Sequence, residues 1–178
     1  MNLWIRVCII WLLTLVRKKT LASEETRTRF MVLPHDIDLN VHLNNGRFLA
    51  FMDLGRLDFT LRTGAAKIFL DKKWNPVVAS ATVRYRKSLG LFKSFDLHTR
   101  IVGSDHKFIY IEQDFVVKNE LYARGAVKIC FLHKKKIVPM TEITSLLQIR
   151  SKTSSEVWIQ AWQALDKSFL KDYSSLQK

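Results

Sequence analysis

Cysteine is nearly missing from this sequence of 178 residues, and acidic residues are scarce. Cys8 and Cys130 both fall in apolar runs, so we expect two buried free thiols and neither a disulfide framework nor a cysteine metal cluster. With 29 Lys and Arg against 16 Asp and Glu, the formal net charge of +13 favours anionic partners. Because no nucleic-acid-binding motif accompanies that charge, lipid headgroups or phosphorylated substrates are expected rather than nucleic acid.

A long hydrophobic run is also missing at the N-terminus. The apolar stretch from Val7 to Val16 is too short for a spanning helix, which needs roughly 20 residues. Basic residues at 17–19 follow it directly, which argues against a cleaved secretory signal. Residues 1–22 are therefore predicted to form an apolar helical segment. Two interpretations stay open: residues 1–19 contact a membrane surface peripherally, or the segment packs against the domain or a partner subunit.

Internal repeats, low-complexity tracts and linkers are absent, which predicts one domain. Residues 28–34 have the length and branching of a strand. From Asn45 to about Thr63 the apolar residues follow a helical stripe, and Gly64 supplies a stop. Short links between the next apolar segments predict four strands in an antiparallel meander. These strands are expected at residues 77–86, 95–102, 108–117 and 121–133.

The pattern returns to helix after Pro139. Residues 153–156 have the spacing of a capping box. An apolar stripe follows, formed by Trp158, Trp162, Leu165, Phe169 and Tyr173. We expect residues 141–178 to be a helical extension packed on a domain of residues 23–140. The predicted class is α+β: a curved antiparallel sheet wrapped around one long central helix, with extra N- and C-terminal helices.

The segment DIDLNVHLNN, residues 36–45, concentrates polar side chains. Asp36, Asp38 and Asn40 match the first three ligand positions of an EF-hand loop, but Val41 stands where the turn needs glycine and the closing glutamate is missing. A zinc site from the two aspartates and His42 lacks a second His or Cys at a customary spacing. We therefore expect no metal site.

Helix capping would explain the two asparagines that end this segment, but not Asp38, Asn40 or His42. Free amides at a helix start favour developing negative charge, so the amides of Asn45 and Gly46 could polarise a carbonyl oxygen. Asp38 or His42 would then act as base or nucleophile. Such a device suits attack on an ester or thioester. The sequence contains no Gly-x-Ser-x-Gly elbow that would indicate a serine nucleophile.

Residues 36–48 resemble the D-x-D-x-N-x-H-V-N-N-x-x-Y signature of hotdog-fold acyl thioesterases, particularly the plant acyl-[acyl carrier protein] enzymes. More broadly, FMDLGR at residues 51–56 and VRYRKSL at 83–89 are similar to segments of the 4-hydroxybenzoyl-CoA thioesterase group. The resemblance covers residues 28–133. With its terminal extensions, the chain looks closest to a bacterial subgroup that is similar to thioesterase superfamily member 6, a subgroup poorly defined in activity.

This resemblance implies a hotdog fold and hydrolysis of an acyl-CoA or acyl-carrier thioester. Asp38 falls on the family's catalytic carboxylate, acting as general base or nucleophile, and Asn40 and His42 fall on its polar partners. The Asn45 amide falls on the oxyanion donor at the helix start, whereas Asp36 shapes the turn. The family's active sites lie between subunits, so the resemblance implies a homodimer, or a tetramer built from two dimers. The expected location is the cytoplasm.

The basic residues after the second predicted strand offer contacts for a substrate that carries phosphates. Arg84, Arg86 and Lys87 would bind coenzyme A or phosphopantetheine, with Gly46 close to the thioester; the alternative is an ordinary exposed basic strand. No cofactor is implied, because coenzyme A belongs to the substrate.

Three departures separate the chain from the family pattern. Val41 replaces the glycine often found before His42, Ser88 replaces a proline, and no residue matches the extra catalytic glutamate of the plant enzymes. The competing function is a non-catalytic hotdog protein that binds acyl-CoA or lipid at a membrane surface. In that case a cytoplasmic protein peripheral to the inner membrane is expected.

Overall fold

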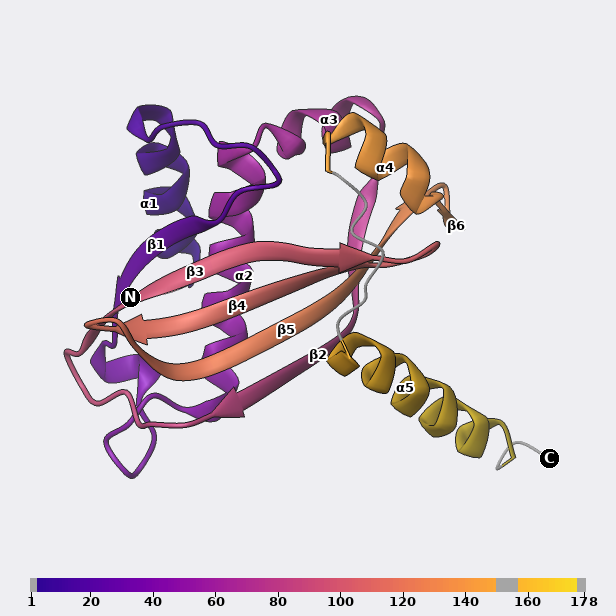
Figure 1. The fold of residues 1–178 in the computed structure, drawn as a ribbon. Helices are drawn as coiled ribbons and strands as arrows, with labels where there is room; N and C mark the ends of the chain where they lie inside the picture. Colours follow the sequence, from indigo (N-terminus) through magenta and orange to yellow (C-terminus); the bar gives the residue numbers. More distant parts are fainter. Residues whose placement is uncertain (1–2, 150–156, 176–178) are drawn as a thin grey trace.

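The computed structural model describes residues 3–149 and 157–175, with side chains as far as Ser168. Helix α1 (Leu3–Val16) precedes strand β1 (Thr26–Met31), a short 3-10 turn η1 (Pro34–Asp36), and helices α2 (Asn45–Arg62) and α3 (Ala65–Asp71). The strands β2 (Asn75–Tyr85), β3 (Ser94–Ser104), β4 (Ile109–Val117), β5 (Glu120–His133) and β6 (Lys136–Ile137) come next. Helices α4 (Met140–Leu146) and α5 (Val157–Ser175) end the described chain (Figure 1).

The strands form one antiparallel sheet in the order β1-β3-β4-β5-β2, with β6 paired to the end of β5. The predicted meander is therefore correct for β3, β4 and β5 and wrong for β2, which lies at the far edge beside β5. The link between β2 and β3 covers residues 86–93, and eight extended residues reach about 26 Å. Because the three strand spacings between β2 and β3 total only about 14 Å, a short link did not require them to be neighbours.

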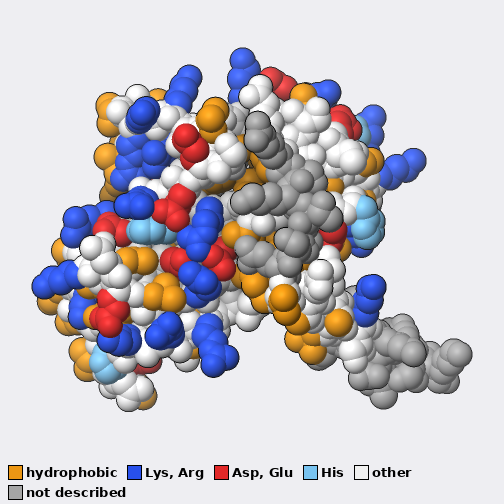
Figure 2. All heavy atoms as spheres, in the orientation of Figure 1, with side chains coloured by type: hydrophobic (Ala, Val, Ile, Leu, Met, Phe, Trp, Pro, Cys, Tyr) orange, Lys and Arg blue, Asp and Glu red, His pale blue; other side chains and the backbone are white. Residues whose placement is uncertain are grey.

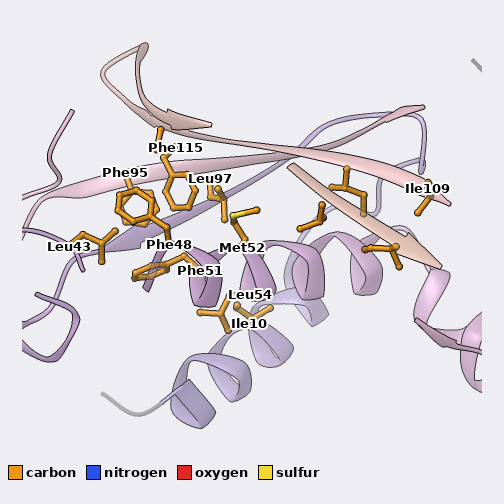
Figure 3. Close-up of a cluster of buried hydrophobic side chains, with 14 of the residues drawn as sticks. Ile10, Leu43, Phe48, Phe51, Met52, Leu54, Phe95, Leu97, Ile109 and Phe115 are labelled. Carbon is orange, nitrogen blue, oxygen red and sulfur yellow. The ribbon is translucent and has the colours of Figure 1, made fainter. Parts of the chain in front are cut away.

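Helix α2 lies across one face of the curved sheet, and aromatic side chains fill the space between them (Figures 1 and 3). Phe48, Phe51 and Met52 from the helix meet Phe95 and Phe115 from the strands, all nearly or fully buried. This arrangement confirms the predicted α+β layout of a sheet wrapped around one central helix.

Helix α1 packs on the side of α2 that faces away from the sheet, where Ile10 and Leu54 lie together in the core cluster (Figure 3). The sequence placed both cysteines inside the protein, and this is wrong for Cys8. Cys130 is buried, but Cys8 is exposed because it lies on the outward face of α1.

Helix α5 covers part of the opposite face of the sheet. Ile159 is fully buried, Trp162 lies edge-on to Tyr110, and Asp166 accepts a hydrogen bond from Lys128 at 2.6 Å. Leu165, predicted for the packing stripe, is mostly exposed. The capping box at residues 153–156 and the side chains of residues 169 and 173 lie outside the described residues. The sequence pattern did not predict the short helix α3, whereas α4 falls at the start of the helical extension predicted for residues 141–178.

Candidate active site

The polar segment folds into a tight loop that leads into α2. The Asp38 amide donates to the His42 carbonyl at 2.9 Å, and the Val41 amide donates to the Asp38 carbonyl at 3.1 Å. The Leu43 amide donates to the carbonyl of Leu89, in the link between β2 and β3, at 2.7 Å. Val41 takes the left-handed conformation with φ of 60°, a conformation that glycine adopts without strain. The β2–β3 link thus fixes the loop beside the start of α2.

Asp38 is half-buried at the base of this loop. Its Oδ1 accepts the backbone amides of Asn40 at 2.9 Å and His42 at 3.5 Å, an Asx-turn arrangement that sets the direction of the carboxylate. Among the described residues, no group donates a hydrogen bond to Oδ2 of Asp38. One oxygen is therefore held by the loop, and the other can receive a proton from water.

The two backbone amides that the sequence predicted as oxyanion donors, both in the first turn of α2, differ in their hydrogen bonding. Asn44 is the N-cap, and its Oδ1 accepts the Gly46 amide at 2.9 Å, so this amide is already occupied. In the described part of the chain the Asn45 amide has no hydrogen-bond acceptor. Only the Asn45 amide can therefore serve a substrate oxygen without breaking the cap.

A cavity of about 320 Å³ joins these groups. It brings together six residues predicted from the sequence: Asp38, Asn40, His42, Asn45, Arg86 and Lys87. Leu43, Phe48, Tyr85, Ser88 and Leu89 complete its walls. The loop, the start of α2 and the end of β2 each contribute one side, which is why residues far apart in the sequence meet here.

Tyr85 is a wall residue that the sequence analysis did not select. Its hydroxyl donates to the Asn45 carbonyl at 3.1 Å, and its ring lies edge-on to Phe48. Burial raises the pKa of the Tyr85 hydroxyl, so it remains a protonated donor at neutral pH. The tyrosine in the VRYRKSL segment was the available signal, but the sequence did not show that β2 ends over the start of α2.

Asp36 points the other way, into the protein interior. Its fully buried carboxylate accepts hydrogen bonds from Arg6 at 2.5 Å and from Arg47 at 2.7 and 3.0 Å, and the Leu33 amide adds another at 3.0 Å. Burial opposes the charged form, but these hydrogen bonds outweigh it and hold the pKa of Asp36 below its ordinary value. Asp36 therefore anchors the loop, and it cannot join Asp38 in a calcium or zinc site.

The structure separates the three basic residues that the sequence grouped for phosphate binding. Arg86 and Lys87 line the cavity, where Lys87 also forms an ion pair with Glu120. Arg84 lies on the opposite face of the sheet, in a different hollow with Arg100 and Arg124. Arg84 lies within β2 and so points to the face opposite Tyr85, whereas Arg86 and Lys87 follow the end of β2, where the strand alternation no longer applies. Figure 2 shows the acidic and basic side chains that mix on that outer face.

Farther along α2, an apolar cavity of about 330 Å³ lies between this helix, α3 and the sheet. Ile109, Ile111 and Phe131 form much of its wall, and Asp53 and Arg56 lie at its polar side. Arg56 pairs with Asp53 and donates to the buried Gln113 side chain at 2.9 Å. Its apolar lining suits a hydrocarbon chain.

Comparison with known proteins identifies the class. Residues 32–153 match the thioesterase-like superfamily over more than half of the chain, and the chain belongs to that superfamily. A protein named THEM6 from Danio rerio is 36% identical over 151 residues, which cover 76% of this chain and 74% of that protein. This match confirms the predicted similarity to thioesterase superfamily member 6.

Solved structures show the same fold. YbaW, a probable thioesterase from Escherichia coli, has a TM-score of 0.65 at 18% identity and covers 68% of this chain and 95% of its own. The DHNA-CoA thioesterase from Staphylococcus aureus has a TM-score of 0.60 at 14% identity and covers 83% and 95%. Together with the sheet wrapped around α2, these similarities confirm the hotdog fold predicted from the sequence.

Proposed function

We propose that this protein hydrolyses the thioester of an acyl-CoA or an acyl carrier protein. One observation carries the proposal: Asp38, which is half-buried, and Asn45, whose backbone amide has no acceptor among the described residues, line the same cavity. A base and an oxyanion donor on one cavity are what acyl transfer to water needs. Membership of the thioesterase-like superfamily supports the same chemistry.

In the proposed reaction, the thioester oxygen faces the Asn45 amide at the first turn of α2. In one route Asp38 removes a proton through Oδ2 as water attacks the carbonyl carbon; the carbon–sulfur bond then breaks, and the leaving thiolate takes a proton. In the other route the carboxylate attacks that carbon itself, the carbon–sulfur bond breaks to release the thiolate and leave a mixed anhydride, and water then hydrolyses the anhydride. Asn40 and His42, which hold Asp38 through their backbone amides, also present side chains to the cavity for positioning and proton transfer.

The surroundings of the cavity fit the two ends of such a substrate. Arg86 and Lys87 at the rim supply positive charge for the phosphates of coenzyme A or phosphopantetheine. The apolar cavity beside Phe131 supplies a surface for an acyl chain.

A thiol-release assay over acyl-CoA substrates of increasing chain length tests this proposal. Asp38→Asn should lower kcat/KM on the order of a hundredfold or more while the protein stays folded, because the substituted side chain cannot accept the proton. Asp71→Asn is the matched control: it makes the same chemical change at an exposed residue outside the cavity and should keep wild-type activity.

Wild-type activity in Asp38→Asn would remove Asp38 from the mechanism. Tight acyl-CoA binding by the wild-type protein without thiol release at any chain length would instead favour the non-catalytic binding function.

We propose in addition that two copies pair through the β2 edge of the sheet. Strand β2 bonds to β5 on one side, and no strand of the described chain covers its other side. Its residues are largely exposed, and Leu39 at the tip of the site loop is fully exposed. An exposed strand edge of this length is a template for pairing, and a second copy would cover the open side of the cavity.

A further inference from the structure

Helix α1 has an inverted distribution of side chains. Its single charged residue, Arg6, is only 4% exposed, whereas Trp4 is 73%, Trp11 54% and Leu15 68% exposed. A helix on the surface of a soluble protein normally turns its charged residues outward and its apolar residues inward. A contiguous apolar surface of this kind marks an interaction site.

Buried ion pairs hold α1 in this orientation. Near its N-terminal end, Arg6 donates to the buried Asp36 and lies over the ring of Phe51, 4.5 Å from the centroid. Just beyond its C-terminal end, Arg17 donates to Asp58 at 2.8 Å, and this carboxylate is also fully buried. Moving α1 away would remove an arginine from each of two buried carboxylates, which is costly. The helix is therefore a fixed part of the domain, and its apolar face stays outward.

We propose that the outward face of α1 docks on the surface of an anionic lipid bilayer. Exposed Lys18 and Lys19 follow the helix directly, in position to meet lipid phosphates while the apolar side chains enter the interface. Trp4 and Trp11 suit the headgroup boundary, because their rings are both apolar and polar. In the described part of the chain, no helix is long and apolar enough to cross a membrane.

The charge around α1 favours a bilayer over a second copy as the occupant of this face. Helix α1 contains no acidic residue, and Lys18 and Lys19 follow it, so a second copy on this face would bring like charges together, whereas an anionic surface is attracted by them. Because Arg6 ties the helix to Asp36, two residues before Asp38, docking would also set the orientation of the candidate site relative to the bilayer.

Vesicle co-sedimentation of the full chain tests this proposal. Vesicles of phosphatidylcholine alone are compared with vesicles that also contain phosphatidylserine. Wild-type protein should sediment with the mixed vesicles, and Trp11→Glu/Leu15→Glu should bind on the order of tenfold more weakly or worse. Leu70→Glu/Phe92→Glu is the matched control, because it adds the same charge at other exposed apolar residues. This control should bind like the wild type. Circular dichroism and thermal melting show whether each variant is folded.

A second pair of variants tests the electrostatic contribution. Lys18→Glu/Lys19→Glu should lose most of the preference for phosphatidylserine, whereas the same change at exposed Lys134 and Lys135 should keep more of it. Wild-type protein that stays in solution with both vesicle types would overturn the proposal. Equal binding by the Trp11→Glu/Leu15→Glu variant would overturn it too. A drop in assembly mass caused by that variant alone would show that α1 instead packs on a second copy.

Discussion

At the scale of single residues, Asp36 and Asp38 lie two positions apart in the sequence but have different surroundings. Both belong to the same polar segment, but Asp36 is fully buried between Arg6 and Arg47, while Asp38 is half-buried at a cavity. The sequence suggested that Asp36 shapes the turn. It did not show that the partner would be an arginine from the N-terminal helix, because nothing in local spacing relates residues 30 positions apart.

We expect Asp36→Asn to lower the free energy of unfolding by about 3–5 kcal/mol at neutral pH, because it leaves two arginines without their buried charge partner. The pKa of Asp36 is lowered in the folded protein, so its stabilising effect is present above about pH 3.9, the ordinary value. That effect is lost as the pH falls through the folded-state pKa. The stability difference between wild type and variant should therefore narrow in acid.

Urea unfolding at a series of pH values measures this difference. Asp38→Asn serves as the comparison, because the same substitution two residues later removes no buried ion pair and should change stability much less. A stability difference for Asp36→Asn that does not change with pH would show that the carboxylate charge is not the stabilising feature.

At the scale of elements, the contact between α2 and the sheet depends on one glycine. A Cβ added to Gly55 would lie 2.6 Å from the Leu97 side chain and 2.9 Å from Thr99 and Gln113, closer than atoms can approach. The helical stripe predicted from Asn45 to about Thr63 gives no sign that this glycine is special. Only the register of α2 against β3 and β4 shows that no larger residue fits there.

Gly55→Ala should destabilise the protein by about 1–3 kcal/mol through overpacking, although alanine favours helix more than glycine does. Gly90→Ala is the matched control, since a Cβ at that position meets no atom within 4 Å. Thermal melting of both variants measures the effect. A higher melting temperature for Gly55→Ala would show that helix propensity outweighs the close contact.

At the scale of the whole molecule, the open β2 edge decides whether the site is complete in one chain. We expect Ala81→Lys, at an exposed edge position, to weaken pairing of two copies, because an edge lysine must lose hydration when another strand approaches. Light scattering after size exclusion should show the wild type as a dimer and the variant with a larger monomer fraction. Thiol release should fall with the dimer fraction. A wild-type protein that is monomeric at all concentrations would contradict this pairing.

The sequence by itself determined the local features: the helix from Asn45, most strand segments, the polar loop and the superfamily. These depend on side-chain periodicity and on motifs within a few residues of one another. The roles of Asp38, Asn40, His42 and Asn45, the dimer and the membrane contact stay predictions for the experiments above.

Tertiary structure alone decided which distant segments meet. In the folded protein β2 lies at the far edge of the sheet, and Arg84 lies on the opposite face from Arg86. The Tyr85 hydroxyl bonds to the start of α2, and the Gly46 amide donates to Asn44. Tertiary structure also turned Arg6 inward and the apolar side chains of α1 outward. The physical reason is that strand order and helix orientation follow from burying the whole core at once, and contacts between distant segments leave no period in the sequence.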